Sequence, residues 1–288
     1  QGRTEEYIGT WLKKSGKRDK IILATKVAGV GNGPSVVKHL RDGTGHLNRK
    51  NIMEAVEGSL RRLQTDVIDL YQLHAPDRTA NYFGRLGYTH NPDEIPVPLE
   101  ETLEVLQELV QAGKVRFIGV SNETPWGVMR FLELSNMKAL PRMASVQNPY
   151  SLLNRSYEVG LAEVSIREEC GLLAYSPMAF GTLSGKYLNG ARPPSGRITL
   201  FERFQRYNGA LAEKAVARYV KIAKDAGMDP AQMALAFVTQ QPFVTSNIIG
   251  ATTLEQLKSN IDSSGVKLSP DVLKAIDAVH TEISNPCP

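Results

Sequence analysis

Short runs of β-branched and other apolar residues alternate along the chain with longer amphipathic segments. The apolar runs are nearly continuous, which is typical of parallel strands covered on both faces. We expect strands at 21–27, 67–74, 115–122, 144–150, 172–177 and 247–252. Helices are expected at 3–14, 49–64, 99–112, 125–137, 159–170, 210–226, 230–240 and 254–261, followed by a last helix that opens at Ser269-Pro270-Asp271. Strands that alternate with helices predict βαβ units and a parallel sheet.

Capping and turn residues mark several of these helix ends. Asn48 or Asn51 could cap the helix at 49–64, and Thr124 precedes a proline in a first helical turn. Gly113 and Gly171 each follow a helix and precede a strand, where a left-handed backbone is often needed. We therefore expect a left-handed glycine at both junctions.

The number of expected strands bears on whether the parallel sheet is open or closed into a barrel. A closed parallel barrel of alternating strands and helices needs eight strands, and an open six-stranded sheet would leave two long edges unpaired. The chain opens at Gln1 without a methionine, and no strand precedes its first helix. We expect an α/β fold, a (β/α)₈ TIM barrel with six of its eight core strands in this sequence. A strand, a helix and a strand, on the order of 50 residues, would precede Gln1, so residues 1–288 form a single, N-terminally incomplete domain.

Composition narrows the class of protein without naming a function. Hydrophobic residues make up 42% of the chain and charged residues 22%, as in ordinary globular domains. The net charge of +4 is spread along the chain, which favours a solvated surface over a nucleic-acid partner. No membrane segment or signal peptide is expected. Cys170 and Cys287 give neither a disulfide framework nor metal-ligand spacing, which favours a cytoplasmic protein without a metal site.

Two polar residues stand at the ends of neighbouring expected strands. Lys26 lies in an otherwise apolar run, where a charge is costly unless it is paired, and His74 ends the next run. Barrel enzymes place catalysis at the carboxyl ends of their strands. Either residue alone could be a strand-end group that reaches solvent or makes a core hydrogen bond. Together, at one rim, they favour a catalytic site.

Several motifs, in this order, resemble those of the aldo-keto reductase family. They are Ala24-Thr-Lys26-Val, Leu63-Gln-Thr-Asp66-Val-Ile-Asp69-Leu-Tyr71-Gln-Leu-His74, Gly119-Val-Ser-Asn122, Val146-Gln-Asn-Pro-Tyr150, Ala174-Tyr-Ser-Pro177 and Gly185-Lys186-Tyr187. The likeness runs from the first helix to the last. It is strongest to the Tas-like group, which also resembles the β subunits of voltage-gated potassium channels.

The resemblance implies reduction of aldehydes or ketones to alcohols by hydride transfer from NADPH. The family's active site uses an aspartate, a tyrosine, a lysine and a histidine, and Lys26 and His74 match the last two. The aspartate and tyrosine belong to a segment expected upstream of Gln1. Asp66 and Asp69 are poor substitutes, because Asp66 precedes its strand and Asp69 lies within it. The tyrosine donates the proton in this family, so this chain alone could be inactive.

The same resemblance implies how the cofactor would be held. Ser121, Asn122 and Gln147 would bind the nicotinamide amide, and Tyr175 would pack on its ring. The pyrophosphate would contact Ser176, Pro177, Met178, Gly181 and Lys186. Gly250 and Thr252 precede a short helix whose amino terminus is suited to an anion, and Gln256 and Asn260 match positions that reach the adenosine end. Arg197 and Lys186 would replace the family's arginine near Gln256 at the 2′-phosphate, which favours NADPH over NADH.

Three questions stay open at this stage. The chain could be a catalytically silent NADPH-binding barrel that senses redox state or scaffolds partners, or a Schiff-base aldolase with Lys26 as nucleophile. The insertion at 75–98 could be a substrate lid or an oligomer contact. The loop that carries Phe201, Phe204 and Tyr207 could fold over the cofactor. The expected partner is a small carbonyl substrate, and a homo-oligomer is possible.

Overall fold

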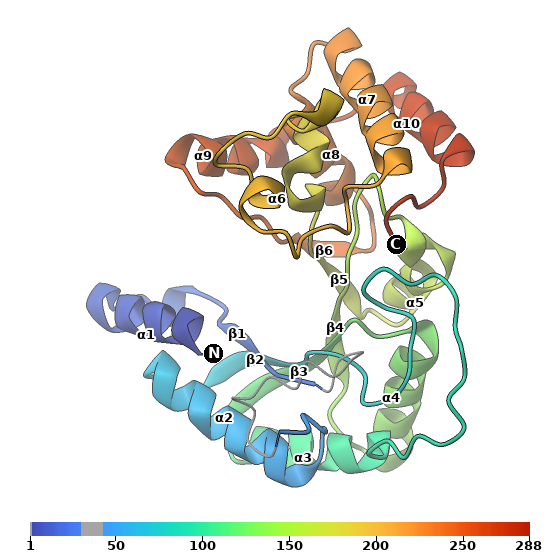
Figure 1. Cartoon of the computed structure of the whole chain (residues 1–288). Helices are drawn as coiled ribbons and strands as arrows, with labels where there is room; N and C mark the ends of the chain where they lie inside the picture. The colour runs from blue at the N-terminus through green and yellow to red at the C-terminus, as the bar shows by residue number, and fades with distance from the viewer. Residues whose placement is uncertain (1, 30–42) are drawn as a thin grey trace. The chain divides into compact units, whose positions relative to one another are not determined.

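The computed structural model of the chain describes residues 2–29 and 43–288. These residues form two compact units, whose course along the chain can be followed in Figure 1. Unit 1 comprises Gln1–Asn81 and Gly87–Val146, and unit 2 comprises Tyr82–Leu86 and Gln147–Pro288. The tip of the long insertion thus belongs to unit 2, while both of its flanks belong to unit 1.

Unit 1 is built on parallel strands that follow one another in chain order. Its strands are β1 (Ala24–Val27), β2 (Ile68–Leu73), β3 (Val115–Ser121) and β4 (Met143–Gln147). Its helices are α1 (Arg3–Ser15), η1 (Arg18–Lys20), α2 (Arg49–Leu63), α3 (Leu99–Gln111) and α4 (Pro125–Lys138). Figure 1 shows α2, α3 and α4 following one another along one side of these strands. The register pairs Lys26 with Gln72 and Gln72 with Gly119.

The helix ends of unit 1 follow the local chemistry of the sequence. Asn48 caps α2 by accepting a bond from the Asn51 amide, and Thr124 caps α4 by accepting one from the Gly127 amide. Gly113 has a φ of 70°, as expected after α3. Helix α1 lies so close to α2 that a Cβ on Gly9 would come within 2.3 Å of the Arg62 carbonyl oxygen. Only glycine permits that approach.

A buried carboxylate joins the amino ends of three strands in unit 1. Asp69 accepts a bond of 2.8 Å from the Leu23 amide and forms ion pairs of 2.8 Å with Arg18 and 2.9 Å with Arg116. Burial raises the pKa of the Asp69 carboxyl, but these bonds and the Arg18 charge outweigh burial and lower it. Asp69 is therefore a structural group at the edge of the strands opposite to Lys26.

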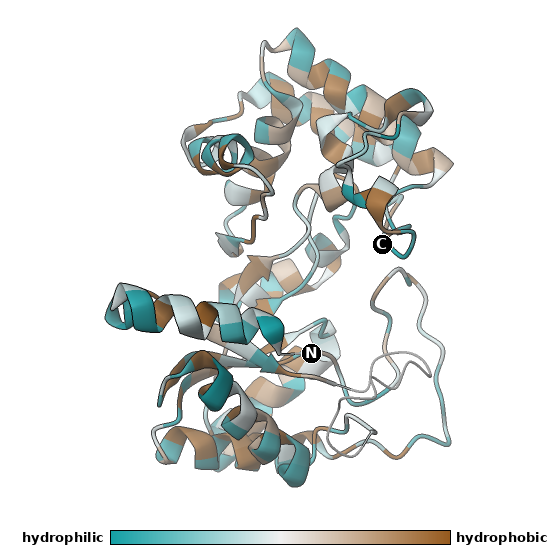
Figure 2. Ribbon diagram, turned by 60° about the vertical axis from the view of Figure 1, so that its left-hand side comes forward, coloured by the Kyte–Doolittle hydropathy of each residue, from teal (hydrophilic) through white to brown (hydrophobic). Residues whose placement is uncertain are grey.

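Unit 2 carries a second parallel pair and most of the remaining helices. Strands β5 (Gly171–Ala174) and β6 (Val244–Asn247) pair in parallel. The helices are η2 (Ser156–Val159), α5 (Leu161–Arg167), η3 (Ala179–Ser184), η4 (Leu188–Gly190), α6 (Arg197–Leu200), α7 (Ala210–Asp225), α8 (Pro230–Thr239), α9 (Leu254–Asp262), η5 (Ser263–Gly265) and α10 (Pro270–Glu282). Figure 2 shows hydrophobic and hydrophilic residues interleaved along these helices, as their amphipathic pattern requires.

Aromatic packing and one arginine hold the core of unit 2 to its last helix. The Tyr150 ring meets Phe243 edge-on at 5.2 Å between centroids, and it stacks on Phe237 at 6.0 Å. Arg155 lies over Phe237 and bonds to Asp277 of α10 at 2.7 Å. The last helix is thus fixed to the loop that follows β4.

Three local expectations differ from the structure in unit 2. The last strand was expected at 247–252 but lies at Val244–Asn247, because residues 250–253 lead into the capped turn of α9. The helix expected at 159–170 is divided into η2 and the shorter α5. The left-handed residue before β5 is Glu169, with a φ of 52°, and not Gly171. Gly171 serves another purpose, since a Cβ there would lie 1.9 Å from Thr245 Oγ1.

Parallel strands alternating with helices make this an α/β fold, as the hydrophobic pattern predicted. Within residues 2–29 and 43–288, no helix is both long enough and apolar enough to span a lipid bilayer.

We expect Asp69→Asn to lower the free energy of unfolding by about 2 kcal/mol, because two arginines lose a buried ionic partner. The pKa of Asp69 is lowered in the folded state, so its contribution is complete at neutral pH. It is lost as the pH falls below about 4, where the unfolded carboxyl takes up its proton first. Urea unfolding at pH 7 and pH 3 measures this. The control is Asp66→Asn at the exposed Asp66, and an equal effect of both substitutions would refute the role of Asp69.

Candidate active site

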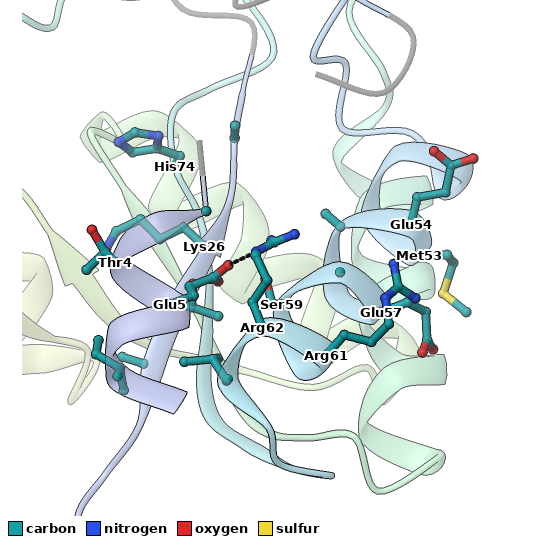
Figure 3. Close-up of a pocket in the computed structure, with 18 residues that line it drawn as sticks. Thr4, Glu5, Lys26, Met53, Glu54, Glu57, Ser59, Arg61, Arg62 and His74 are labelled. Carbon is teal, nitrogen blue, oxygen red and sulfur yellow. Dashed lines mark hydrogen bonds and ion pairs between the residues drawn. The ribbon is translucent and has the colours of Figure 1, made fainter. Parts of the chain in front are cut away.

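Lys26 and His74 line one cavity of about 1070 Å³ in unit 1. Its walls come from α1, β1, α2 and the end of β2. Figure 3 shows Lys26 and His74 on one side of it, with Glu54, Glu57 and Arg61 of α2 on the other. Lys26 pairs in register with Gln72, and side chains two residues apart on a strand share a face, so Lys26 and His74 project from the same face of the sheet. The sequence placed both residues at one rim, and this geometry brings them together.

Both basic groups have lowered pKa values. Burial lowers the pKa of the Lys26 ammonium. Loss of surrounding water and the Lys26 charge lower the pKa of His74 below its usual 6.5, although part of its ring stays exposed. At neutral pH His74 is therefore mainly the neutral imidazole, which both donates and accepts a hydrogen bond.

Gln72 adds an unsatisfied group next to this pair. Its side chain is fully buried, and neither its Oε1 nor its Nε2 has a hydrogen-bond partner among the described residues. A buried amide without partners is costly, so this position calls for a water molecule or a ligand group. The motif that identified His74 contains Gln72, but the sequence analysis gave it no role.

The cavity wall also contains a hydrogen-bonded network around Glu5, which the sequence did not predict. Glu5 accepts a bond of 2.6 Å from the Thr25 hydroxyl and one of 2.6 Å from Arg62 Nε, as the dashed line in Figure 3 marks. Burial raises the pKa of Glu5, but these bonds outweigh it and the pKa is lowered. Glu5 thereby joins α1, β1 and α2. Charged residues on two amphipathic helices look like solvent-facing residues in the sequence, so no signal singled them out.

Asn122 connects the end of β3 to the end of β2. Its φ is 55°, and its Nδ2 donates a bond of 2.8 Å to the His74 carbonyl oxygen. Ser121 and Asn122 are both buried, and Asn122 Nδ2 also lies 3.2 Å from Ser121 Oγ. These two expected nicotinamide ligands therefore stand beside His74 in unit 1.

The remaining expected site residues belong to unit 2. Gln147 ends β4, and Tyr175 follows β5. The backbone of Tyr175 is fixed on both sides, since its amide donates to Asn148 and its carbonyl accepts from Tyr150. Burial raises the pKa of the Tyr175 phenol to about 12, although a hydrogen bond from Arg206 and its charge lower it. Tyr175 is thus a neutral, partly buried ring at neutral pH.

The loop after Tyr175 is a series of tight turns that keeps Lys186 close to Gly181. Ser176 has a φ of 57°, and the Gly181 amide donates a bond of 2.8 Å to the Met178 carbonyl, while Pro177 is buried. Gly181 has a φ of 90°, and a Cβ there would lie 3.0 Å from Lys186 Nζ. The structure brings Gly181 and Lys186 together, with the lysine exposed at the surface of the loop.

The other expected cofactor-binding residues of unit 2 are Arg197 and those of the turn before α9 and of α9 itself. Arg197 is exposed and stacks on Phe204, with 4.2 Å from its guanidinium to the ring centroid. Gln256 Oε1 accepts bonds from the amide and the hydroxyl of Thr252. Asn260 Nδ2 donates a bond of 3.1 Å to the Gly250 carbonyl. Both amide side chains thus shape the 250–252 turn.

Comparison with known proteins shows the family to which the chain belongs. The family model described as aldo/keto reductase matches residues 1–281. The protein named Protein tas of Escherichia coli K12 is 56% identical over 288 residues, which are all of this chain and 82% of that relative. The chain belongs to the aldo-keto reductase family.

Membership of the family fixes the fold and the broad activity. The family fold is the (β/α)₈ barrel, which confirms the predicted fold class, and the protein is an oxidoreductase. Two more distant relatives carry different names. An L-glyceraldehyde 3-phosphate reductase of E. coli O157:H7 is 29% identical over 96% of this chain and 75% of its own length. A probable voltage-gated potassium channel subunit beta of rice is 28% identical over 96% of this chain and 79% of its own length.

We expect Lys26→Met to raise the pKa of His74, because the substitution removes the nearby ammonium charge. The pKa is measured by NMR titration of the His74 ring, assigned with a His74→Gln variant. Lys20→Met removes an exposed lysine from the adjoining segment and should leave the titration unchanged. The same titration in both lysine variants would show that Lys26 and His74 do not share an electrostatic environment.

Proposed function

We propose that this aldo-keto reductase family member reduces aldehydes or ketones to alcohols, with NADPH as the hydride donor. The observation that carries the proposal is the pairing of Lys26 and His74 in one cavity at the carboxyl ends of adjacent parallel strands. Groups with lowered pKa values that meet in a cavity are typical of catalytic sites.

The two residues suit complementary roles toward a carbonyl group. The imidazole of His74 is mainly neutral, so it can donate a hydrogen bond to the carbonyl oxygen and orient it. The Lys26 ammonium can stabilise the negative charge that develops on that oxygen. NADPH, when bound, supplies the hydride. The reaction also needs a proton donor, which in the family is a tyrosine. The described residues that line the cavity include no tyrosine.

Each unit, taken by itself, holds groups that suit part of a nicotinamide dinucleotide. Ser121 and Asn122 offer buried polar groups beside His74, and Gln147 and Tyr175 offer an amide and an aromatic face in unit 2. Lys186 beside left-handed Gly181, the exposed Arg197, and the turn Gly250–Thr252 at the start of α9 offer cations and backbone amides to phosphates. Among the described residues, the bonds of these two side chains use Gln256 Oε1 and Asn260 Nδ2, which leaves Gln256 Nε2 as a donor and Asn260 Oδ1 as an acceptor for the adenosine end.

A second candidate is an NADPH-binding protein without turnover. It is favoured by the rice relative's name as a potassium channel subunit. A third candidate is a Schiff-base aldolase, which the lowered pKa of Lys26 would suit. The two are told apart by chemistry, because an aldolase would be trapped on Lys26 by borohydride and a carbonyl substrate.

We expect NADPH to bind to the purified chain, which is measured by the change in nicotinamide fluorescence, with the intact mass of the same sample recorded. Lys26→Met should keep this binding, and in a protein that also carries the expected upstream aspartate and tyrosine it should lower the turnover of an aromatic aldehyde at least about a hundredfold, the usual cost of losing oxyanion stabilisation. Lys20→Met is the matched control. Full turnover by Lys26→Met would remove Lys26 from the mechanism.

The same experiment separates the candidates. Binding with no turnover in a protein that also carries the expected upstream aspartate and tyrosine would favour the silent NADPH-binding protein. No binding would refute the proposal for this chain. Borohydride inactivation that requires a carbonyl compound and disappears in Lys26→Met would favour the aldolase.

A further inference from the structure

The segment after α10 folds back onto unit 2 and is held at three points. The Asn285 side chain accepts a bond of 2.6 Å from the Arg155 amide, and the Cys287 amide donates one of 3.1 Å to the Leu153 carbonyl. The third point is the Pro288 carbonyl, which accepts a bond of 2.6 Å from Arg206 Nε. Cys287 is buried, with 2% of its surface exposed. This segment is therefore a docked part of the unit.

Arg206 also contacts the tyrosine that follows β5. Its side chain makes a hydrogen bond to Tyr175, and its guanidinium lies 5.4 Å from the centroid of the Tyr207 ring. Its charge lowers the pKa values of Tyr175, Tyr207 and Cys287, so the guanidinium lies near all three groups. Arg206 thus joins the docked segment to the aromatic part of the candidate cofactor site.

We propose that Arg206 is a positioning residue, which holds the Tyr175 ring in the orientation that packs on nicotinamide and is itself held by the docked segment through Pro288. The proposal rests on the function proposed above, because it assumes that Tyr175 meets the nicotinamide ring.

The backbone of Tyr175 is fixed, so its side chain is the part that Arg206 can order. Backbone bonds to Asn148 and Tyr150 fix the main chain on both sides of the ring. The hydroxyl end of the side chain is then the part that is still able to move. A planar guanidinium can bond to a carbonyl and a phenol at once, which fixes that end as well. Ordering the ring before the ligand arrives lowers the entropy cost of binding.

The neighbouring arginine offers a matched comparison. Arg203 lies in the same loop, but it is exposed and packs on Phe204, with 4.9 Å from its guanidinium to the ring centroid. A substitution of Arg203 therefore removes the same charge from the same loop and leaves the bonds to Pro288 and Tyr175 in place.

We expect Arg206→Gln to weaken NADPH binding about tenfold, the loss expected for a charge-assisted hydrogen bond, and to leave the KM for the carbonyl substrate unchanged. Arg206→Lys should give an intermediate Kd, because an ammonium keeps the charge without the planar fork. Arg203→Gln should bind NADPH as the unsubstituted chain does. The Kd is measured by fluorescence titration, and Tm is recorded for each variant.

A double-mutant cycle with Tyr175→Phe makes the test independent of simple unfolding. Tyr175→Phe keeps the ring but removes the hydroxyl, so Arg206→Gln should then have a smaller effect on the Kd and on Tm than in the unsubstituted chain; the Tm effect that remains comes from the lost bond to Pro288. Additive effects in both measurements would overturn the proposal, as would an unchanged Kd in Arg206→Gln.

The Tm cycle distinguishes this proposal from the function on which it rests. If the unsubstituted chain does not bind NADPH, the proposed function fails, and the cycle in Tm alone decides whether Arg206 holds Tyr175. Non-additive Tm shifts support the link, and additive shifts overturn it. If NADPH binds and the effects are additive, the proposed function stands and the role of Arg206 falls.

Discussion

Parallel pairing of β1, β2 and β3 is the constraint on which the candidate site depends. Parallel strands end at the same edge of a sheet, so the pairing of Lys26 with Gln72 carries Lys26 and His74 to one rim and one face. The opposite ends are fixed by Asp69, which draws Leu23, Arg18 and Arg116 together. The structural ion pairs are thus separated by the length of a strand from Lys26 and His74, for which the described residues offer no ion-pair partner. The ion pairs that stabilise the fold therefore do not use the basic groups at the rim.

The rim is suited to chemistry because its polar groups are only partly satisfied. The Lys26 ammonium loses water to burial, His74 loses water and also faces a cation, and the Gln72 amide has no partner among the described residues. Each condition costs stability and each is relieved by a polar ligand, so the free energy of binding such a ligand can be used at these groups. In unit 2, by contrast, Tyr175 is already bonded, which suits a group that must be ordered before a ligand arrives.

Much of the fold could be read from the sequence, since buried strands and amphipathic helices differ in period, and caps such as Asn48 and Thr124 are local. Lys26 and His74 were found because a charge is unexpected at such positions. The predictions from the sequence were wrong or incomplete where contacts between distant parts of the chain determine the local structure. Gly171 is needed for the approach of Thr245, and neither residue reveals this alone. Glu5 with Arg62, and Arg206 with Pro288, join residues far apart in the chain. Their side chains resemble ordinary surface charges until the partner is known.

The insertion after β2 has a consequence for how the chain folds. Tyr82–Leu86 belong to unit 2, whose other residues begin only at Gln147, and a Cβ on Gly84 would lie 3.9 Å from the Pro288 carbonyl oxygen. Neither unit is therefore a continuous stretch of chain. The entropy of closing so long a loop has to be lost before the contacts within unit 2 compensate for it. On the ribosome, the tip of the insertion emerges long before its neighbours around Pro288 are made, so unit 2 can be completed only after Pro288 has been added.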